Sequence, residues 1–373
     1  MCIRDSYDYS VVVSDSNGTE STIKTFGKQK DEDYLPHVLQ NYTLGLLPKL
    51  PEPWLMVVAW PSPHSPFTPA SWAVDQFGDL EAPITPNFNA SASSMMQKHW
   101  LMRQLTPITE QEKKEHIDLS YHRRLETLLT VDEHVGQLHS LLSILGIWDH
   151  TVALYTSDNG FQFGQHRLAI DKRHLYENDI RIPFFVRGLD GVWSEKNTTS
   201  TDVVVSVDIA PTLWDVMQGQ DKLASPQELP SYMDGVSLLR CPHRNGCDRR
   251  DFLVSYNGEA DPRCGLADCP IPSAGSMWYM PDSWNNTYHC VRTVHQDAVK
   301  SGENTIFCSF MDDEDFVEYY NLKTNPYQLD NDIQFLSDSQ AQVYKDRLKY
   351  LLSCRGVTCR SFPDFVSTAA STA

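Results

Sequence analysis

Residues 151–160 read TVALYTSDNG, a short apolar run that ends in a polar turn. Two similar runs follow at 182–186 (IPFFV) and 203–207 (VVVSV), and the second leads into DIAPTLW at 208–214, a typical helix start. Upstream, 54–60 (WLMVVAW) is the longest apolar stretch and predicts one buried strand. Short apolar strands that alternate with helical segments predict an α/β layer structure with a large, mostly parallel sheet.

The spacing of apolar residues predicts helices around these strands. Residues 31–47 have helical spacing, and 118–146 form the longest helical pattern, with Gly146 as its C-terminal cap. Residues 68–100, rich in Pro, Ser and Asn, predict a long loop. No apolar run approaches the roughly 20 residues that a membrane span needs.

From about residue 250 the pattern changes to short β-like runs that alternate with turns and cysteines. These runs are 252–256, 276–279, 288–294, 305–310 and 316–322. Followed by a helical pattern at 340–352, they predict a smaller antiparallel sheet with a closing helix. We therefore expect a division into residues 7–245 and a smaller, disulfide-containing part, 246–373.

The first six residues, 1–6 (MCIRDS), look like a sequencing artefact. They are what a transposase-type sequencing adaptor encodes when it is read in frame. We expect the natural sequence to continue upstream of Tyr7, so the lack of a signal peptide says nothing about the compartment.

Cysteines and glycosylation sequons favour the secretory pathway. Eight cysteines lie after position 240, and this even number indicates disulfides formed in an oxidising compartment. Zinc binding is the alternative, but it is disfavoured because the sequence contains no Cys-x-x-Cys pair. Spacing makes three pairs plausible but leaves the connectivity open: Cys241 with Cys247, Cys264 with Cys269, and Cys354 with Cys359, beside Cys290 and Cys308. The sequons are Asn17, Asn41, Asn89, Asn197 and Asn285.

The formal charge of −18 argues against nucleic-acid binding, which needs a basic face. It is also unfavourable for a polyanionic sugar. A local cluster of Lys, Arg and His can nevertheless outweigh the overall charge within about 8–10 Å.

Four residues could carry chemistry. Asp158 and Asn159 offer a carboxylate and an amide oxygen, which suit Ca²⁺, although Asp-Asn-Gly is also an ordinary turn. Lys172 could hold a sulfate or phosphate oxygen, or be a surface lysine. His64, between prolines, could be a turn residue or a general acid. Asp158, Asn159 and His64 follow predicted strands, where α/β sheets bind ligands.

These segments resemble the sulfatase family of the alkaline-phosphatase-like superfamily. The likeness rests on 63–66 (PHSP), 155–160 (YTSDNG), 164–168 (GQHRL), 171–177 (DKRHLYE), 179–183 (DIRIP), 208–212 (DIAPT) and 233–238 (MDGVSL). The segments 284–293, 318–322 and 354–359 are similar to the tail of the N-acetylglucosamine-6-sulfatase subfamily. The resemblance implies that 7–245 is the C-terminal part of a sulfatase catalytic domain.

The resemblance also implies roles for individual residues. Asp158 and Asn159 would be ligands of one Ca²⁺ ion, and Lys172 would contact the sulfate. His64 would donate a proton to the departing sugar oxygen.

More loosely, the resemblance implies that His166 and Arg167 line the substrate mouth. The implied reaction removes 6-sulfate from N-acetylglucosamine (glucosamine) 6-sulfate residues of heparan sulfate or keratan sulfate, in the lysosome or outside the cell.

The nucleophile of the family is missing from this sequence. Sulfatases use a cysteine in Cys-x-Pro-Ser-Arg, oxidised to formylglycine, and none of the nine cysteines is followed by x-Pro-Ser-Arg. We therefore expect this chain alone to be inactive. Two alternatives remain, a catalytically dead sulfatase-like binding protein and a phosphatase or phosphodiesterase of the same superfamily. An extracellular endosulfatase is disfavoured because its usual long basic insertion is missing.

Overall fold

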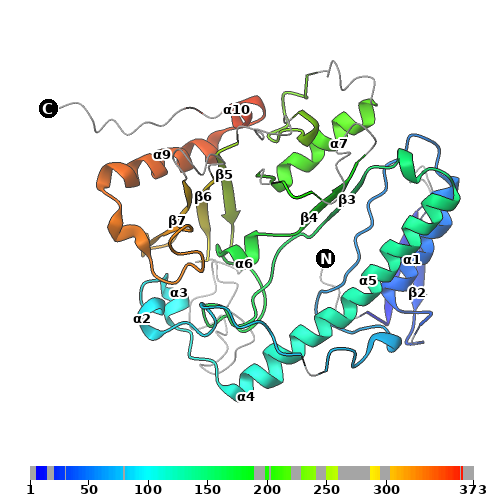
Figure 1. The fold of residues 1–373 in the computed structure, drawn as a ribbon, viewed down its shortest axis with the longest axis horizontal. Coiled ribbons are helices and arrows are strands. Elements are labelled where there is room, and N and C mark those ends of the chain that lie inside the picture. Colours follow the sequence, from blue (N-terminus) through cyan, green and yellow to red (C-terminus); the bar gives the residue numbers. More distant parts are fainter. Residues whose placement is uncertain are drawn as a thin grey trace. The chain divides into compact units, whose positions relative to one another are not determined.

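A computed structural model (Figure 1) describes residues 6–14, 21–29, 31–78, 80–188, 198–200, 203–219, 228–240, 249–258, 286–294, 303–361 and 363. Its internal contacts divide the chain into two compact units. The first unit is Met1–Pro83 with Glu110–Thr151, and the second is Ile84–Thr109 with Val152–Ala373. Each unit is described by itself. The predicted boundary after residue 245 stays a prediction.

The first unit contains a β-hairpin and two main helices. Strands β1 (Tyr9–Ser14) and β2 (Ser21–Phe26) pair antiparallel. Helices α1 (Leu35–Leu46) and α5 (Leu119–Ile144) confirm the two predicted helices. The shorter elements are η1 (Leu47–Lys49), η2 (Ser71–Ala73), α4 (Glu110–Glu112), the π-helical η3 (Lys113–Asp118) and η4 (Trp148–His150).

Two local contacts explain how these helices end and pack. Gly146, with φ of +73°, follows the end of α5 in the left-handed conformation that glycine adopts easily, as predicted. The side-chain amide of Gln40 on α1 donates a hydrogen bond to the carbonyl of His134 on α5 over 3.1 Å.

The apolar stretch 54–60 differs from its prediction. It is extended, but within the described residues it forms no strand pairing, and its side chains alternate between half-buried and exposed. Leu55 is 55% exposed and Val57 79%. The prediction of one buried strand is therefore wrong here, because only one face of the segment is covered.

In the second unit, β3 (Ala153–Thr156) pairs antiparallel with β4 (Phe184–Arg187). Both strands match the predicted strands closely. The chain reverses direction through α6 (Glu177–Ile180), so the two strands pair antiparallel instead of parallel. The large parallel sheet is not seen among the described residues and stays a prediction.

The predicted strand 203–207 is wrong. The segment leads instead into the 3₁₀ turn η5 (Ser206–Asp208), because the carboxylate of Asp208 accepts the Val205 N–H over 3.0 Å. The predicted helix does follow, as α7 (Ile209–Gln218).

The C-terminal sheet confirms its prediction. Strands β5 (Asp251–Tyr256), β6 (Tyr288–Val294), β7 (Asn304–Phe310) and β8 (Val317–Asn321) pair antiparallel in this order. Helix α9 (Asp338–Ser353) closes one face, as Figure 1 shows. A buried cluster joins sheet and helix: Val291, Phe307, Tyr319, Tyr344, Leu348 and Leu351. The predicted run 276–279 lies outside the described residues.

Residues 84–109 contribute a second buried cluster with the same sheet. The predicted loop, 68–100, carries the short helix α2 (Ala92–Met95), and α3 (Trp100–Arg103) begins at its last residue. Their side chains pack into a core whose buried members include Met95, Met102, Tyr176, Ile306 and Cys308. The remaining short elements are η6 (Leu238–Arg240), η7 (Asp332–Phe335) and α10 (Val357–Arg360).

Two disulfides stabilise this part of the chain. Cys354–Cys359 confirms a pair predicted from spacing, and Cys290–Cys308 joins directly opposite residues of β6 and β7. Cys241, Cys247, Cys264 and Cys269 lie outside the described residues. Among those described, no helix has the length and apolar character needed to cross a bilayer.

Candidate active site

The polar turn after β3 carries the two predicted metal ligands. The Asp158 carboxylate is exposed and accepts the Asn159 N–H over 3.0 Å. The side-chain amide of Asn159 donates to the Gly160 carbonyl over 2.8 Å, and the hydroxyl of Ser157 donates to the Asn159 carbonyl over 2.9 Å. These bonds hold a compact turn whose carboxylate faces solvent.

Gly160 joins this turn to the start of α6. Its N–H donates to the carbonyl of Asp179 over 2.8 Å, and the next N–H, of Phe161, donates to the carbonyl of Asn178 over 2.9 Å. A Cβ atom on Gly160 would lie 1.9 Å from the Asn178 oxygen. The approach of the two backbones therefore requires glycine.

The loop 161–174 carries Lys172 and has an unusual backbone. Four non-glycine residues in it have positive φ angles: His166 (53°), Arg167 (63°), Asp171 (94°) and Arg173 (112°). Each such conformation costs on the order of 1–2 kcal/mol and persists only where the surrounding structure holds it. Two of them flank Lys172 directly. Strain of this kind is often found at functional sites.

The buried carboxylate of Asp179 holds both ends of this loop. One oxygen accepts the His174 N–H over 2.7 Å, and the other accepts the side-chain amide of Gln162 over 3.0 Å. The Gln162 N–H in turn donates to the Asp171 carbonyl over 2.8 Å. Burial away from water raises the pKa of Asp179 to about 8.

Lys172 itself is half-buried and has no ion pair within the described part of the chain. It lines a small cavity of about 10 Å³ together with Gln162, Leu168, Ile170, Asp171, Arg173 and His174. A space of this size holds about one water molecule. A lysine with no carboxylate partner beside a small cavity is available for an anion.

His166 is enclosed in the interior, with an exposed fraction of 0%. Its N–H donates to the Asn87 carbonyl over 2.7 Å, and its Nε2 lies 3.1 Å from the side-chain amide of Asn87. Its ring lies 4.1 Å from that of Tyr176. Burial holds its pKa well below the usual range. A substrate would reach this ring only if the packing opened.

Arg167 is tied to backbone carbonyls. Its guanidinium donates to the Ala90 carbonyl over 2.8 Å and to the Leu105 carbonyl over 3.0 Å. The predicted role of His166 and Arg167 at the substrate mouth stays a prediction, and their observed contacts are with residues 84–109.

His64 lies in an exposed turn of the first unit. Its Nδ1 is 2.8 Å from the Ser65 carbonyl, so this nitrogen carries the proton and Nε2 is left for other partners. Arg124 of α5 donates to the Pro63 carbonyl over 2.7 Å and holds the turn. Asp158, Asn159 and Lys172 belong to the second unit.

The donor set fits part of a calcium site. Ca²⁺ takes about six to eight oxygen ligands, and Asp158 and Asn159 supply two of the right kind. Among the described residues there is no cluster of three His, Cys, Asp or Glu side chains that could hold a metal. A complete site would therefore need further oxygen ligands.

Three sequons lie outside the described residues: Asn17, Asn197 and Asn285. Asn41 is exposed on α1. In Asn89, the nitrogen that a glycan would need already donates to the Ile108 carbonyl over 2.9 Å. Glycosylation stays a prediction.

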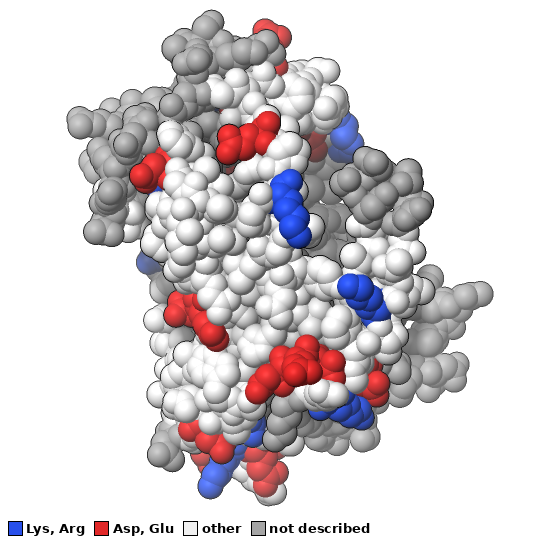
Figure 2. Space-filling view, turned by 90° about the vertical axis from the view of Figure 1, so that its right-hand side faces the viewer, with Lys and Arg blue, Asp and Glu red and all other residues white. Residues whose placement is uncertain are grey.

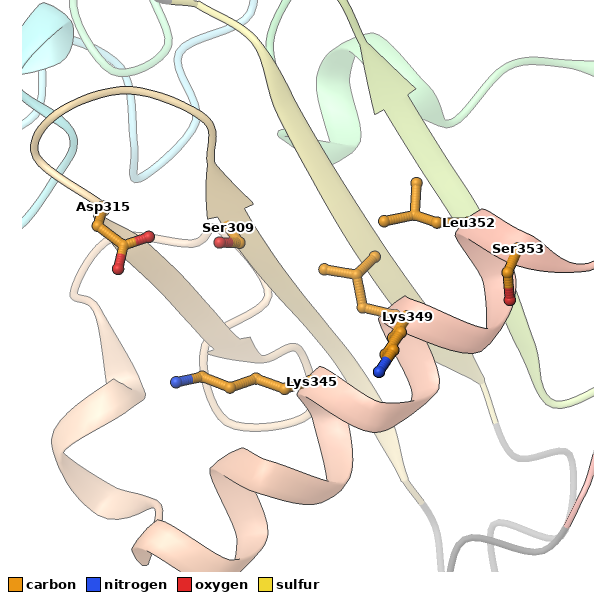
Figure 3. Close-up of a pocket in the computed structure, with 7 residues that line it drawn as sticks. Ser309, Asp315, Lys345, Lys349, Leu352 and Ser353 are labelled. Atoms are coloured by element: carbon orange, nitrogen blue, oxygen red, sulfur yellow. The ribbon is translucent and has the colours of Figure 1, made fainter.

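Two other surface features are found among the residues that the structure describes. A shallow groove between α9, β7 and the turn before β8 is lined by Ser309, Asp315, Lys345, Leu348, Lys349, Leu352 and Ser353 (Figure 3). It contains none of the predicted residues. On the face shown in Figure 2, charges of both signs lie scattered, without one continuous basic patch.

Gly160, Gln162 and Asp179 were not predicted as site residues. Asp179 lies within the segment DIRIP, which supported the family resemblance but suggested no role of its own. Its role becomes visible only when the turn after β3 and the Lys172 loop are seen to meet at it.

The chain is similar to curated sulfatases. N-acetylglucosamine-6-sulfatase of Bos taurus is 37% identical over 346 residues, which are 90% of this chain and 58% of the bovine protein. The Homo sapiens protein of the same name is 38% identical over 346 residues, covering 90% and 59%. The chain thus spans less than two thirds of the length of these relatives.

The fold is also similar to solved structures. A protein solved in complex with its substrate D-glucosamine-2-N,6-O-disulfate has a TM-score of 0.61 and 21% identity, over 90% of this chain and 70% of its own. The family model described as Sulfatase matches residues 4–219. The chain therefore belongs to the sulfatase family.

Proposed function

We propose that the complete protein removes the 6-sulfate from N-acetylglucosamine (glucosamine) 6-sulfate residues of heparan sulfate or keratan sulfate. The observation that carries this proposal is the junction at Asp179, where the turn of Asp158 and Asn159 meets the loop of Lys172. Two oxygen ligands and one cation on joined segments suit an anionic ester. The relatives named N-acetylglucosamine-6-sulfatase support this substrate, and so does the D-glucosamine-2-N,6-O-disulfate bound by a structural neighbour.

Each predicted site residue of this chain would have its own role in the reaction. Asp158 and Asn159 would hold Ca²⁺, which when bound would offset the negative charge of the sulfate. The ammonium of Lys172 would contact a sulfate oxygen and stabilise the charge of the transition state. His64, as the imidazolium with a proton on each nitrogen, would donate its Nε2 proton to the sugar oxygen as the ester bond breaks, while Nδ1–H stays bonded to the Ser65 carbonyl.

The nucleophile would come from sequence beyond this chain. The family's formylglycine derives from a Cys-x-Pro-Ser-Arg motif, which these residues do not contain. We therefore assign the chain alone no turnover. The same missing sequence would supply further calcium ligands and the strands of the large parallel sheet. The exposed apolar side chains of Val57 (79%) and Phe185 (64%) support a larger protein, because further sequence packed against them would bury them.

The compartment is proposed on separate grounds. Two disulfides in the described residues support an oxidising, secretory environment, and the sequons agree with it. We assign the protein to the lysosome, with secretion as the alternative. The substrate would be a sulfated glycosaminoglycan rather than a nucleic acid.

Sequencing of the transcript upstream of the codon for Tyr7 tests this proposal. The expected result is a signal peptide, the Cys-x-Pro-Ser-Arg motif and an Asp-Asp pair, which the family resemblance implies as the remaining calcium ligands. Another residue in place of the cysteine would favour a dead binding protein or a phosphatase. A genuine start at Met1 would overturn the proposed enzyme.

A further inference from the structure

We propose that Asp179 is a positioning residue that sets Lys172 against the Asp158–Asn159 pair. The inference deepens the proposed function, on which its catalytic part rests. Its geometric part rests on hydrogen bonds of the second unit alone.

The backbone of Asp179 fixes the turn that carries the ligand pair. Its carbonyl accepts the N–H of Gly160, the residue that follows Asn159, over 2.8 Å. No side chain separates the two segments, since even a Cβ on Gly160 would lie 1.9 Å from the Asn178 oxygen. A movement of residue 179 would therefore be transmitted directly to the turn.

The side chain of Asp179 fixes the loop that carries the lysine. It accepts the His174 N–H, two residues after Lys172, over 2.7 Å. It also accepts the side-chain amide of Gln162 over 3.0 Å, and the Gln162 N–H is bonded to the carbonyl of Asp171, the residue before Lys172. One carboxylate thus holds the loop on both sides of Lys172.

Asp179 is itself held by a rigid support. Its N–H donates to the Tyr176 carbonyl over 2.8 Å within the first turn of α6. In that turn, the Glu177 carboxylate accepts from the guanidinium of Arg292 on β6 over 3.0 Å, and the Glu177 N–H donates to the side chain of Gln328 over 2.8 Å. The C-terminal sheet therefore anchors the residue that orders the site.

Positioning and plain structural support make different predictions. If Asp179 only stabilises the fold, its loss would lower stability without a specific effect on the turnover of folded protein. If it positions Lys172, folded protein would also turn over more slowly, because a misplacement of about 1 Å can cost on the order of 100-fold in rate.

The variants are Asp179→Ala, Asp179→Asn and the matched control Asp215→Ala. Asn keeps an oxygen for the His174 N–H. Its amide can donate to the Oε1 of Gln162, a buried atom without a partner in the described residues, once the Gln162 amide turns over. Asp215 of α7 is likewise buried, and its carboxylate pairs with Arg240 over 2.6 and 2.7 Å.

Amide hydrogen exchange on the chain tests the geometry without any turnover. We expect exchange at 171–174 to rise at least about 10-fold in Asp179→Ala, to stay near wild type in Asp179→Asn, and to be unchanged in Asp215→Ala. Unchanged protection of 171–174 in Asp179→Ala would overturn the inference, whatever the activity of the protein.

Kinetics on the protein extended upstream test the consequence. We expect kcat for N-acetylglucosamine 6-sulfate to fall by about 100-fold in Asp179→Ala, to recover to within about 5-fold in Asp179→Asn, and to be unaffected in Asp215→Ala. Folded Asp179→Ala with wild-type kcat would overturn the positioning role. An inactive wild type would instead count against the proposed function, and the exchange result would still decide the geometry.

Discussion

Gly160→Ala is the most local test of the junction between β3 and α6. The new Cβ would lie 1.9 Å from the Asn178 oxygen, whereas real Cβ atoms essentially never come closer than 3.0 Å. The two backbones would have to separate by at least about 1.1 Å. That shift would stretch the bonds from Gly160 to Asp179 and from Phe161 to Asn178, now 2.8 and 2.9 Å.

The expected loss of stability is about 2 kcal/mol, since overpacking costs roughly 1–3 kcal/mol. The assay is amide exchange of residues 157–162 over a urea series, which reports the local free energy of opening. Gly136→Ala is the control, because Gly136 lies on α5 with no atom within 4 Å of an added Cβ. The free energy of unfolding of this control should increase by about 0.5–1 kcal/mol. A Gly160→Ala protein within about 0.3 kcal/mol of wild type would refute the close approach.

Three further predictions concern the core and the metal. Burial lowers the pKa of Lys98 from 10.5 to about 8. Between pH 8 and 10.5 the Lys98 ammonium is therefore retained in the unfolded chain and lost in the folded one. The free energy of unfolding should consequently rise by about 3 kcal/mol as the pH increases over this range. Lys98→Met should remove that rise when urea unfolding is measured as a function of pH. The prediction would be contradicted if the free energy of unfolding had the same pH dependence in the variant and the wild type. Phe307→Ala should cost about 3–5 kcal/mol in chemical denaturation, because the ring is fully buried and stacks on Tyr344, whereas a change below about 1 kcal/mol would contradict the packing. Chelation should abolish the sulfatase activity of the upstream-extended protein and Ca²⁺ should restore it, with weaker restoration in Asp158→Ala; full activity under chelation would count against a metal.

Helices were the most predictable part of the fold. The helices found at α1, α5, α7 and α9 were all expected, because a 3.6-residue pattern and its caps are local properties of the sequence. Strand pairing is not local. The segment 54–60 looks like a buried strand, yet in the described residues it has no partner strand, and 203–207 bends because Asp208 caps it.

In the candidate site, too, local sequence features were predictable and contacts between distant segments were not. The family resemblance predicted roles for Asp158, Asn159 and Lys172, because their motifs are contiguous in the sequence, and these roles stay predictions. His166 was interpreted as a loop residue at the substrate mouth, but it is buried against Asn87, 79 positions away. The role of Asp179 was missed for the same reason, since its partners come from two separate segments.

The central claim is tested most directly by measuring sulfate release from N-acetylglucosamine 6-sulfate by the protein extended upstream, beside its Lys172→Ala variant. The account predicts release by the wild type and at least about 100-fold less by the variant. It would be contradicted by release of phosphate from N-acetylglucosamine 6-phosphate without release of sulfate. It would equally be contradicted by no turnover in a protein that carries the formylglycine.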